Sequence, residues 1–303
     1  MILRTHTPLI TSALVEELHT KSAVPKPTAM GTPLRYSSAF GCGRQQGYAA
    51  FDAEPTEPMD EAGAWATGLG TIIHEALQDC ISRKYPSAQF EVASQLGDIS
   101  GSCDALISLE EIRASHDDWD VDWGQGTHLL YELKTMGTYS FDKQLGWNRM
   151  RGTVTDGEGP AHKAIAQAGM NALGIMAANP DIDIEWLVMG SITFEALSKN
   201  KAASMGVEGV NRFLAEYYIP SSEWKPLASE ELSRMRGLAY NIEQGYLPDR
   251  HGVTDGGQFL ELNPNSSKYW QCDYCAFRTA CQQDGPGQVR ILDSVITKRK
   301  EVQ

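Results

Sequence analysis

The sequence predicts an α/β fold in which helices flank a central mixed sheet. Residues 61–85 carry apolar side chains at steps of three and four, the spacing of one face of a helix. Residues 103–109 and 128–134 instead place apolar side chains at alternate positions, which indicates strands with two different faces. Helices and strands that follow one another in this way pack as layers around one sheet.

The remaining elements follow from similar patterns. They are expected at 161–178 (a helix of small residues), 185–194 and 212–219 (strands) and 229–244 (an amphipathic helix). The last helix has acidic side chains in its first turn and Gly245 past its end. The chain from 110 to 127 is expected to be an exposed connection. Residues 1–30 are expected to be loosely ordered, because Pro25 and Pro27 break regular structure.

The size and composition of the chain allow one composite domain with a well-buried core. It has 303 residues, of which 42% are hydrophobic and 21% are charged. We expect an N-terminal segment over 1–60, a core over 61–220 and a C-terminal part over 221–303. No apolar run approaches the roughly 20 residues of a membrane helix, and the start of the chain does not resemble a secretory signal. A cytoplasmic location is therefore expected.

The net charge of −13 limits which partners the chain can bind. Lys and Arg normally supply the affinity of a protein for nucleic acid, so this balance argues against a tight, non-specific DNA-coating protein. The acidic residues gather at 52–61 and 117–122, which is compatible with an enzyme that has a narrow basic channel. Bound divalent cations would also neutralise carboxylates in an active site.

Six cysteines in a reducing compartment are better explained as metal ligands or buried side chains than as disulfides. Cys80 and Cys103 fall on apolar faces of the first helix and the first strand, so both are expected in the core. The other four combine a C-x2-C-x5-C pattern with one distant partner: Cys42, Cys272, Cys275 and Cys281. Thiolates grouped in this way bind an iron–sulfur cluster or zinc.

The spacing of these four cysteines favours an iron–sulfur cluster over zinc. Zinc sites made of thiolates alone usually use two short C-x2-C pairs, and this chain has one. Structural zinc stays open as the alternative. Because Cys42 is far from the other three in the sequence, the centre would hold the two chain ends together, a structural role rather than a redox one.

Glu132 and Lys134 form an E-x-K pair on the second strand. Residues two apart on a strand share a face, about 6.5 Å apart along the backbone, so the carboxylate can hold a cation while the amine approaches its bound water. Asp104, on the polar face of the neighbouring strand, would supply a second carboxylate for Mg²⁺ or Mn²⁺. His74, at the edge of the apolar face of the first helix, would be a further ligand, more compatible with Mn²⁺.

The order of these motifs resembles a known nuclease family. GTIIHEAL, GSCDALI, YELK and AIAQAGMN follow one another as in the RecB-type branch of the PD-(D/E)xK nucleases. IEQGYLPDR followed by CDYCAFRTAC resembles the C-terminal end of its iron–sulfur members. Those members include AddB-type helicase-nucleases, the CRISPR-associated "Cas-four" exonucleases and phage relatives. The resemblance spans Tyr36 to Cys281, most of the chain.

This resemblance implies a PD-(D/E)xK core with an iron–sulfur lobe built from both chain ends. It implies a [4Fe-4S] cluster on the four cysteines Cys42, Cys272, Cys275 and Cys281. The catalytic residues that it implies are Asp104, Glu132, Lys134 and Gln167, and the implied metal ligands are His74, Asp104, Glu132 and the carbonyl of Leu133. Two positions depart from the family pattern, because Asn171 stands where Tyr is usual and Cys103 precedes Asp104 where Pro is usual.

Basic and aromatic side chains near these motifs are candidates for contacts with DNA. Lys and Arg pair with phosphates, and aromatic rings stack on unpaired bases. The basic candidates are Arg44, Arg149, Arg151 and Lys163, and the aromatic candidates are Tyr48 and Trp147.

Together the motifs predict a metal-dependent DNA exonuclease that hydrolyses phosphodiester bonds on single-stranded ends and carries a structural [4Fe-4S] cluster. Two other classes stay open. One is a DNA-binding or recombination partner with a vestigial nuclease site, which Asn171 and the acidic charge favour. The other is a structural zinc protein. Among nucleases, an enzyme that trims DNA for CRISPR adaptation competes with a phage replication or recombination exonuclease, which would work in the host cytoplasm.

Overall fold

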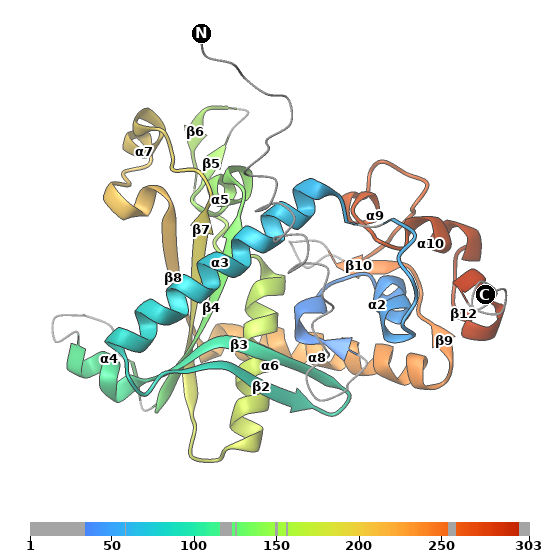
Figure 1. Ribbon diagram of the computed structural model, residues 1–303, viewed down its shortest axis with the longest axis horizontal. Coiled ribbons are helices and arrows are strands. Elements are labelled where there is room, and N and C mark those ends of the chain that lie inside the picture. The colour runs from blue at the N-terminus through green and yellow to red at the C-terminus, as the bar shows by residue number, and fades with distance from the viewer. Residues whose placement is uncertain are drawn as a thin grey trace, which may run out of the picture.

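The protein forms a six-stranded mixed sheet with helices on both faces, so the predicted α/β layers are confirmed (Figure 1). The computed structural model describes residues 34–57, 59–115, 123–124, 126–148, 151–155, 157–253 and 259–296. The expectation for residues 1–30 lies outside these ranges. Within them, none of the helices combines the length and the apolar character needed to cross a membrane.

The strands of the main sheet run in the order β1-β3-β4-β7-β8, and β2 pairs with the other edge of β3. Their bounds are Leu34–Arg35 (β1), Gln89–Leu96 (β2), Ile99–Ser108 (β3), His128–Met136 (β4), Ile184–Thr193 (β7) and Leu214–Pro220 (β8). β4 and β7 are parallel, as are β1 and β3, whereas the other pairs are antiparallel. The predicted strands are found with ends shifted by one or two residues, except that β3 begins four residues before its predicted start.

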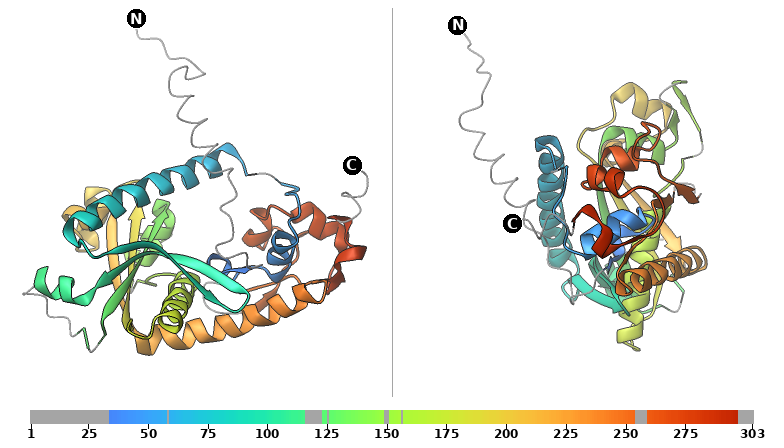
Figure 2. Two further views of the ribbon diagram at one scale, coloured as in Figure 1. Left: turned by 60° about the horizontal axis from the view of Figure 1, so that its bottom comes forward. Right: turned by 90° about the vertical axis from the view of Figure 1, so that its right-hand side faces the viewer.

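Two hydrophobic clusters cover the two faces of this sheet. The helices α3 (Glu61–Lys84) and α4 (Leu109–Ser115) lie with one cluster on one face, and α6 (His162–Ala178) and α8 (Ser221–Glu243) lie with the other. Figures 1 and 2 show α3 and α8 on opposite sides of the strands. The alternation predicted for β4 is confirmed, because Tyr131 and Leu133 pack on the α3 side whereas Leu130 packs on the α6 side.

The sheet opens between β3 and β4. Their pairing covers Ala105–Ser108 of β3 and His128–Tyr131 of β4, and β1 pairs with the opposite end of β3 at Ile99 and Ser100. Within the described residues, no strand pairs with this edge of β3 between those two ends. Past Tyr131, β4 pairs with β7 alone in the part of the chain that the structure describes. This opening places the main chain of residues 132–134 beside a gap in the sheet.

A second lobe combines the two ends of the described chain. Figure 1 shows α2 among the elements of the C-terminal segment, and the long helix α8 extends from the sheet to this lobe. The elements of the lobe are α2 (Gly43–Ala50), β9 (Tyr246–Leu247), β10 (His251–Val253), β11 (Phe259–Glu261), α9 (Trp270–Asp273), α10 (Arg278–Asp284) and β12 (Val289–Arg290). Two further hydrophobic clusters form its core. The smaller elements elsewhere are η2 (Tyr36–Ser38), α5 (Thr138–Gln144), β5 (Trp147–Asn148), β6 (Thr153–Val154), α7 (Lys199–Ser204), η3 (Gly209–Arg212) and η4 (Ile291–Asp293).

Three expectations about secondary structure need correction. The last predicted helix begins at Ser221 rather than at 229 and contains Pro226, because Trp224 in its first turns is fully buried against α6. The expected connection over 110–127 is in part the helix α4, whose Leu109 and Ile112 are buried. The prediction omits the strand β2 over 89–96, although Phe90, Val92 and Leu96 alternate there with polar or small residues and are half-buried.

Candidate active site and cysteine cluster

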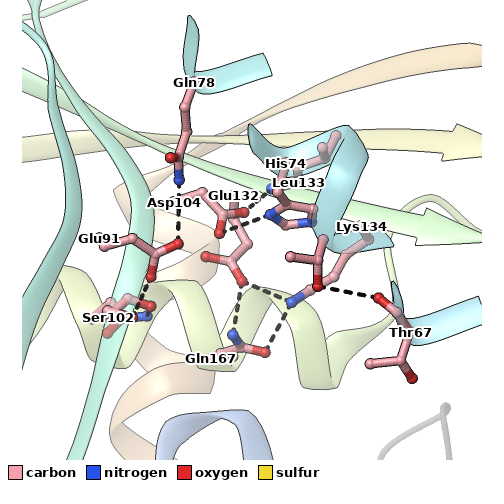
Figure 3. A network of polar contacts seen from close by, with 12 residues as sticks. Thr67, His74, Gln78, Glu91, Ser102, Asp104, Glu132, Leu133, Lys134 and Gln167 are labelled. Atoms are coloured by element: carbon pink, nitrogen blue, oxygen red, sulfur yellow. Dashed lines mark hydrogen bonds and ion pairs between the residues drawn. The ribbon is translucent and has the colours of Figure 1, made fainter. Parts of the chain in front are cut away.

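A cleft of about 690 Å³ lies at the opening between β3 and β4. The five predicted side chains that line it are His74, Asp104, Glu132, Lys134 and Gln167. His74 comes from α3 on one face of the sheet, whereas Gln167 comes from α6 on the other face (Figure 3). A continuous sheet would separate these two helices, so the gap between the strands is what allows the five side chains to meet.

Asp104 joins the two strands at the point where they separate. Its Oδ2 accepts a hydrogen bond of 2.6 Å from the main-chain nitrogen of Leu133, and its Oδ1 lies 3.2 Å from Nδ1 of His74. A residue in an extended strand directs its N–H and its C=O to the same neighbour, so the carbonyl of Leu133 also faces the side of Asp104. The side chain of Leu133 is buried in the core on the α3 side, which leaves its main chain to take part in the site.

Glu132 is buried, and one of its carboxylate oxygens accepts hydrogen bonds from two side chains. Its Oε1 accepts hydrogen bonds of 2.7 Å from Lys134 Nζ and of 2.7 Å from Gln167 Nε2. Lys134 Nζ also donates to Gln167 Oε1 at 3.1 Å, so the three side chains form a closed ring of hydrogen bonds. Glu132 is 2% exposed, and its Oε2 has no hydrogen-bond partner among the described residues (Figure 3). A buried carboxylate oxygen without a partner is costly unless a ligand satisfies it.

Burial changes the protonation of two groups in this region. It raises the pKa of Glu132 to about 7, although the ammonium of Lys134 acts in the opposite direction. Burial also raises the pKa of the Cys103 thiol, and the nearby carboxylates of Glu132 and Asp104 add to this effect. Cys103 is therefore a neutral thiol, and its predicted place in the core is confirmed.

A close approach between α3 and β4 positions His74. A Cβ atom added at Gly70 would lie 2.8 Å from Oγ1 of Thr135, a spacing that real Cβ atoms do not adopt. Glycine at this position therefore lets α3 lie close to β4. His74, one turn further along α3, is half-buried beside Asp104 as a result.

Asn171, the departure from the family pattern, lies outside the cleft. It is fully buried, and its Nδ2 donates to the carbonyl of Ser102 at 2.9 Å while its Oδ1 accepts from Ser94 Oγ at 3.3 Å. These contacts hold α6 against β2 and β3. The residue is therefore part of the packing beneath the site, and it does not touch Glu132 or Lys134.

Two carboxylates that line the cleft, Glu75 and Glu91, have no counterpart among the predicted site residues. Glu91 of β2 lines the same cleft, where its Oε1 accepts from Gln78 Nε2 at 3.2 Å and its Oε2 accepts from Ser102 Oγ at 3.0 Å. Apolar residues at 90, 92 and 96 alternate with polar or small ones and could have indicated a strand, but Glu91 itself looks like an ordinary surface carboxylate in the sequence. Only the pairing of β2 with β3 places it opposite the predicted residues.

The four predicted cysteine ligands come together in the second lobe. Cys42, Cys272, Cys275 and Cys281 line one small cavity between α2 and the C-terminal segment. Burial raises the pKa of Cys272 and Cys275 to about 11 and that of Cys281 to about 12, and in each case the neighbouring Cys42 adds to the rise. Four thiols that resist ionisation next to one another fit a cationic centre, because bound metal ions reverse this effect and favour the thiolates.

The chain turns sharply just before Cys42. Phe40 adopts a φ of 55°, and its main-chain nitrogen donates to Oε1 of Glu231 at 2.7 Å. Glu231 is buried on α8 and also accepts hydrogen bonds from Nε and Nη2 of Arg234, each at 2.7 Å. This buried ion pair fixes the turn, so that Cys42 precedes α2 with its thiol inside the lobe.

Three predictions about single residues are wrong. Arg44 is fully buried and donates to the carbonyl of Pro248 at 2.6 Å and to that of Gly287, so it holds the lobe together and cannot contact DNA. Tyr48 is fully buried as well, and its hydroxyl donates to Asp284 at 2.7 Å, so its ring cannot stack on a base. Cys80 is exposed on the outer side of α3 instead of lying in the core.

The other candidates for DNA contact have different positions. Arg151 and Lys163 are exposed, whereas Arg149 lies outside the described residues. Trp147 is half-buried, and Nζ of Lys201 lies 5.4 Å from the centre of its ring. Arg151 and Lys163 therefore keep the access that contact with a phosphate requires.

The donors in the cleft suit a hard divalent cation. Within the described residues, no three His, Cys, Asp or Glu side chains already stand at the spacing of a single-ion site. However, the free Oε2 of Glu132, the carboxylate of Asp104 and the carbonyl of Leu133 are the oxygen ligands that Mg²⁺ and Mn²⁺ prefer. The residues present therefore fit such an ion, with His74 as a nitrogen donor beside Asp104.

Comparisons with known proteins do not identify a family. No family model matches the chain, and no curated protein matches it either. Among solved structures, the crystal structure of SSO0001 matches with a TM-score of 0.42 and 16% sequence identity, over 90% of this chain and 96% of that chain. A likeness at this level establishes neither a family nor a function.

Proposed function

We propose that the protein is a metal-dependent deoxyribonuclease that hydrolyses phosphodiester bonds at the cleft between β3 and β4. The observation that supports this most strongly is the surroundings of Glu132. Its carboxylate is buried, one oxygen is bound by Lys134 and Gln167, and the other has no partner among the described residues and lies in a cleft that also holds Asp104. A bound cation would satisfy the carboxylate oxygen that has no partner. A purely structural ion pair would not require such an oxygen to be left free.

Each side chain has a distinct part in this proposal. Glu132 and Asp104 would hold the cation together with the carbonyl of Leu133, and His74 would complete the ligand set. When bound, Mg²⁺ or Mn²⁺ lowers the pKa of water and screens the charge of the phosphate. Gln167 keeps the carboxylate and the ammonium in place through its two hydrogen bonds.

Lys134 is the group that would act on the water or on the phosphate. Its Nζ is held 2.7 Å from Glu132 and its side chain is one-third exposed to the cleft. An ammonium in this position can orient an attacking water, and it can offset the charge that develops on the phosphate in the transition state. Lysine contributes here through a point charge, so glutamine would keep the hydrogen bond but lose the effect on charge.

The cysteine lobe would bind a [4Fe-4S] cluster that holds the two ends of the described chain together. The four thiols share one cavity, and their raised pKa values match a site that is completed by a cationic centre. The visible absorbance of the purified protein tests this directly, because iron–sulfur clusters absorb broadly and zinc does not absorb. A colourless protein with one equivalent of zinc would select the zinc alternative.

The choice of DNA and of single-stranded ends as substrate rests on the resemblance of the motifs to RecB-type nucleases. Partners in replication, recombination or CRISPR adaptation stay predictions on the same ground. The alternative of a vestigial site loses one of its two arguments, because Asn171 lies in the packing beneath the cleft and not among the reacting groups.

Digestion of end-labelled single-stranded and double-stranded DNA in Mg²⁺ and in Mn²⁺ tests the proposal. We expect degradation that stops with EDTA and that falls at least a hundredfold in Lys134→Gln and in Asp104→Asn. The matched control is Lys199→Gln, an exposed lysine of α7 outside the cleft. Cleavage that persists in EDTA would overturn the proposal, and DNA binding without turnover in any divalent ion would select the vestigial module.

A further inference from the structure

A buried arginine lines the cavity that the four cysteines share. Arg250 stands at the end of the segment IEQGYLPDR and is 7% exposed. Among the described residues, its Nε has no hydrogen-bond partner and no carboxylate forms an ion pair with it. A buried cation without a counter-charge is costly, so this position requires an anionic group nearby.

The main chain holds Arg250 at the wall of this cavity. Its carbonyl accepts a hydrogen bond of 2.6 Å from the main-chain nitrogen of Leu262, which is buried and lines the same cavity. Two residues earlier, the carbonyl of Pro248 accepts from Nε of Arg44 at 2.6 Å. The chain around Arg250 is thus held at two points, which limits how far its side chain can move toward solvent.

Two other arginines line the cavity, and both have partners. Arg44 donates to two main-chain carbonyls. Arg278 donates to Asp273 at 2.7 Å and to a main-chain carbonyl at 3.0 Å, and its side chain is 30% exposed. Protein groups therefore account for these two side chains. Within the part of the chain that the structure describes, nothing comparable accounts for the guanidinium of Arg250.

The cysteines are the groups near Arg250 that can become anionic. Burial raises the pKa of the Cys281 thiol to about 12, whereas the guanidinium groups of Arg44 and Arg250 act in the opposite direction. Arg250 is therefore close enough to favour a thiolate at this position. Four thiolates together outweigh the positive charge of an iron–sulfide core, so the assembled site is negative overall.

We propose that Arg250 is the internal counter-cation of the [4Fe-4S] site, and that its buried guanidinium balances the negative charge of the assembled centre. This inference rests on the proposed cluster. Arg250 makes the lobe depend on its cofactor, because the same side chain opposes folding of the empty lobe and stabilises the loaded one. It also favours the reduced state, since nearby charge and hydrogen bonds set the potential of such a centre.

The melting temperature of the full chain, measured with the cluster and after a chelator has removed it, tests this inference. The variant is Arg250→Met, which removes the charge and keeps an unbranched side chain. With the cluster, we expect the variant to melt about 2–4 °C or more below the wild type. Without the cluster, the variant is expected to melt at the same temperature as the wild type or higher.

Two further variants show whether the charge itself is responsible. Arg250→Lys keeps the charge and is expected to restore most of the stability that depends on the cluster. The matched control is Arg278→Met, which removes the same charge from the same cavity. It is expected to lower both melting temperatures by similar amounts, because the contacts of Arg278 with Asp273 and a main-chain carbonyl do not require the cluster.

The midpoint potential of the cluster is a second readout that does not depend on nuclease activity. It is measured from the EPR signal of the reduced cluster during a reductive titration. Arg250→Met should lower the equilibrium constant for reduction about tenfold, a shift of about 59 mV to lower potential for one electron. Arg250→Lys should stay close to the wild type. If the wild-type cluster resists reduction, the melting comparison decides.

The outcomes separate this inference from the proposed cluster. A colourless wild type would overturn both. With a brown wild type, an equal loss of stability in both states would show that the fold or an ordered water satisfies Arg250, and it would overturn this inference alone. An unchanged potential in Arg250→Met, or the same shift in Arg278→Met, would do the same. Loss of the cluster from Arg250→Met supports the inference if Arg250→Lys retains it and overturns it if Arg250→Lys does not.

Discussion

Oδ2 of Asp104 lies 2.6 Å from the main-chain nitrogen of Leu133, so a side chain takes the hydrogen bond that a neighbouring strand ordinarily accepts. This contact marks the place where β3 leaves β4. It gives Asp104 two roles, because it satisfies a buried main-chain donor and presents a carboxylate to the cleft. The two roles can be separated by substitution.

Asp104→Asn and Asp104→Ala are expected to differ in stability but not in activity. The asparagine oxygen can still accept from Leu133, so the fold should be kept, whereas alanine leaves a main-chain donor without a partner at a cost of about 1–3 kcal/mol. Both remove the charge that would hold a cation. Urea denaturation and DNA cleavage, measured on both variants, check this; equal stability of the two would show that the contact with Leu133 contributes nothing.

The pH dependence of metal binding is expected to follow Glu132. Burial raises its pKa to about 7 from an ordinary value of 4.5, so below about pH 7 a proton competes with the cation. The Mn²⁺ concentration needed for half-maximal activity should rise about tenfold for each pH unit below 6, since the carboxylate fraction falls tenfold per unit. A titration at pH 5, 6 and 8 checks this, and an unchanged Mn²⁺ requirement would contradict it.

The free energy of unfolding of the metal-free protein should change with pH in the direction opposite to that of a protein stabilised by ordinary ion pairs. Because the pKa of Glu132 is higher in the folded chain than its ordinary value of 4.5, the folded state binds more protons between about pH 4.5 and 7. The contribution of Glu132 to the free energy of unfolding is thus present at low pH and is lost as the pH rises toward 7. Comparing the wild type with Glu132→Gln in EDTA isolates this contribution, which should be absent in the variant.

Arg44→Ala should lower the stability of the cysteine lobe and should not remove a contact with DNA. Truncation would leave the carbonyl of the buried Pro248 without its donor and remove the contact with Gly287, with an expected cost of about 1–3 kcal/mol. Limited proteolysis should then cut the C-terminal segment before the sheet. Arg151→Ala, at an exposed position, serves as the control. If Arg44→Ala melted like the wild type and lost DNA binding alone, the structural role would be wrong.

Restoring the family residue at position 171 should not improve activity. Asn171 is fully buried between α6 and the strands, and its Oδ1 lies 3.1 Å from where a Cβ on Gly101 would be. A tyrosine ring does not fit this space without displacing its neighbours, so Asn171→Tyr should cost about 1–3 kcal/mol from overpacking. Melting temperature and nuclease rate together check this, and a gain in rate at unchanged stability would contradict it.

The sequence by itself determined the layered α/β fold and most of its elements. Helices and strands that bury one face repeat apolar residues with a period that the chain displays directly, as α3 and β4 do. The five side chains of the cleft and the four cysteines were also predicted, because each group is tied to a local motif. The prediction missed β2, a short strand whose alternating apolar residues Phe90, Val92 and Leu96 are only half-buried.

Only the tertiary structure decided which polar residues face solvent and which hold the fold. Arg44 and Tyr48 resemble DNA-binding residues in the sequence, yet both are buried by a C-terminal segment more than 190 positions away. Glu91 shows the opposite case, since pairing with β3 turns an unremarkable glutamate into the neighbour of Asp104. Contacts between distant segments leave no periodic trace in the sequence, because they depend on how whole elements pack and not on the spacing of residues within one element.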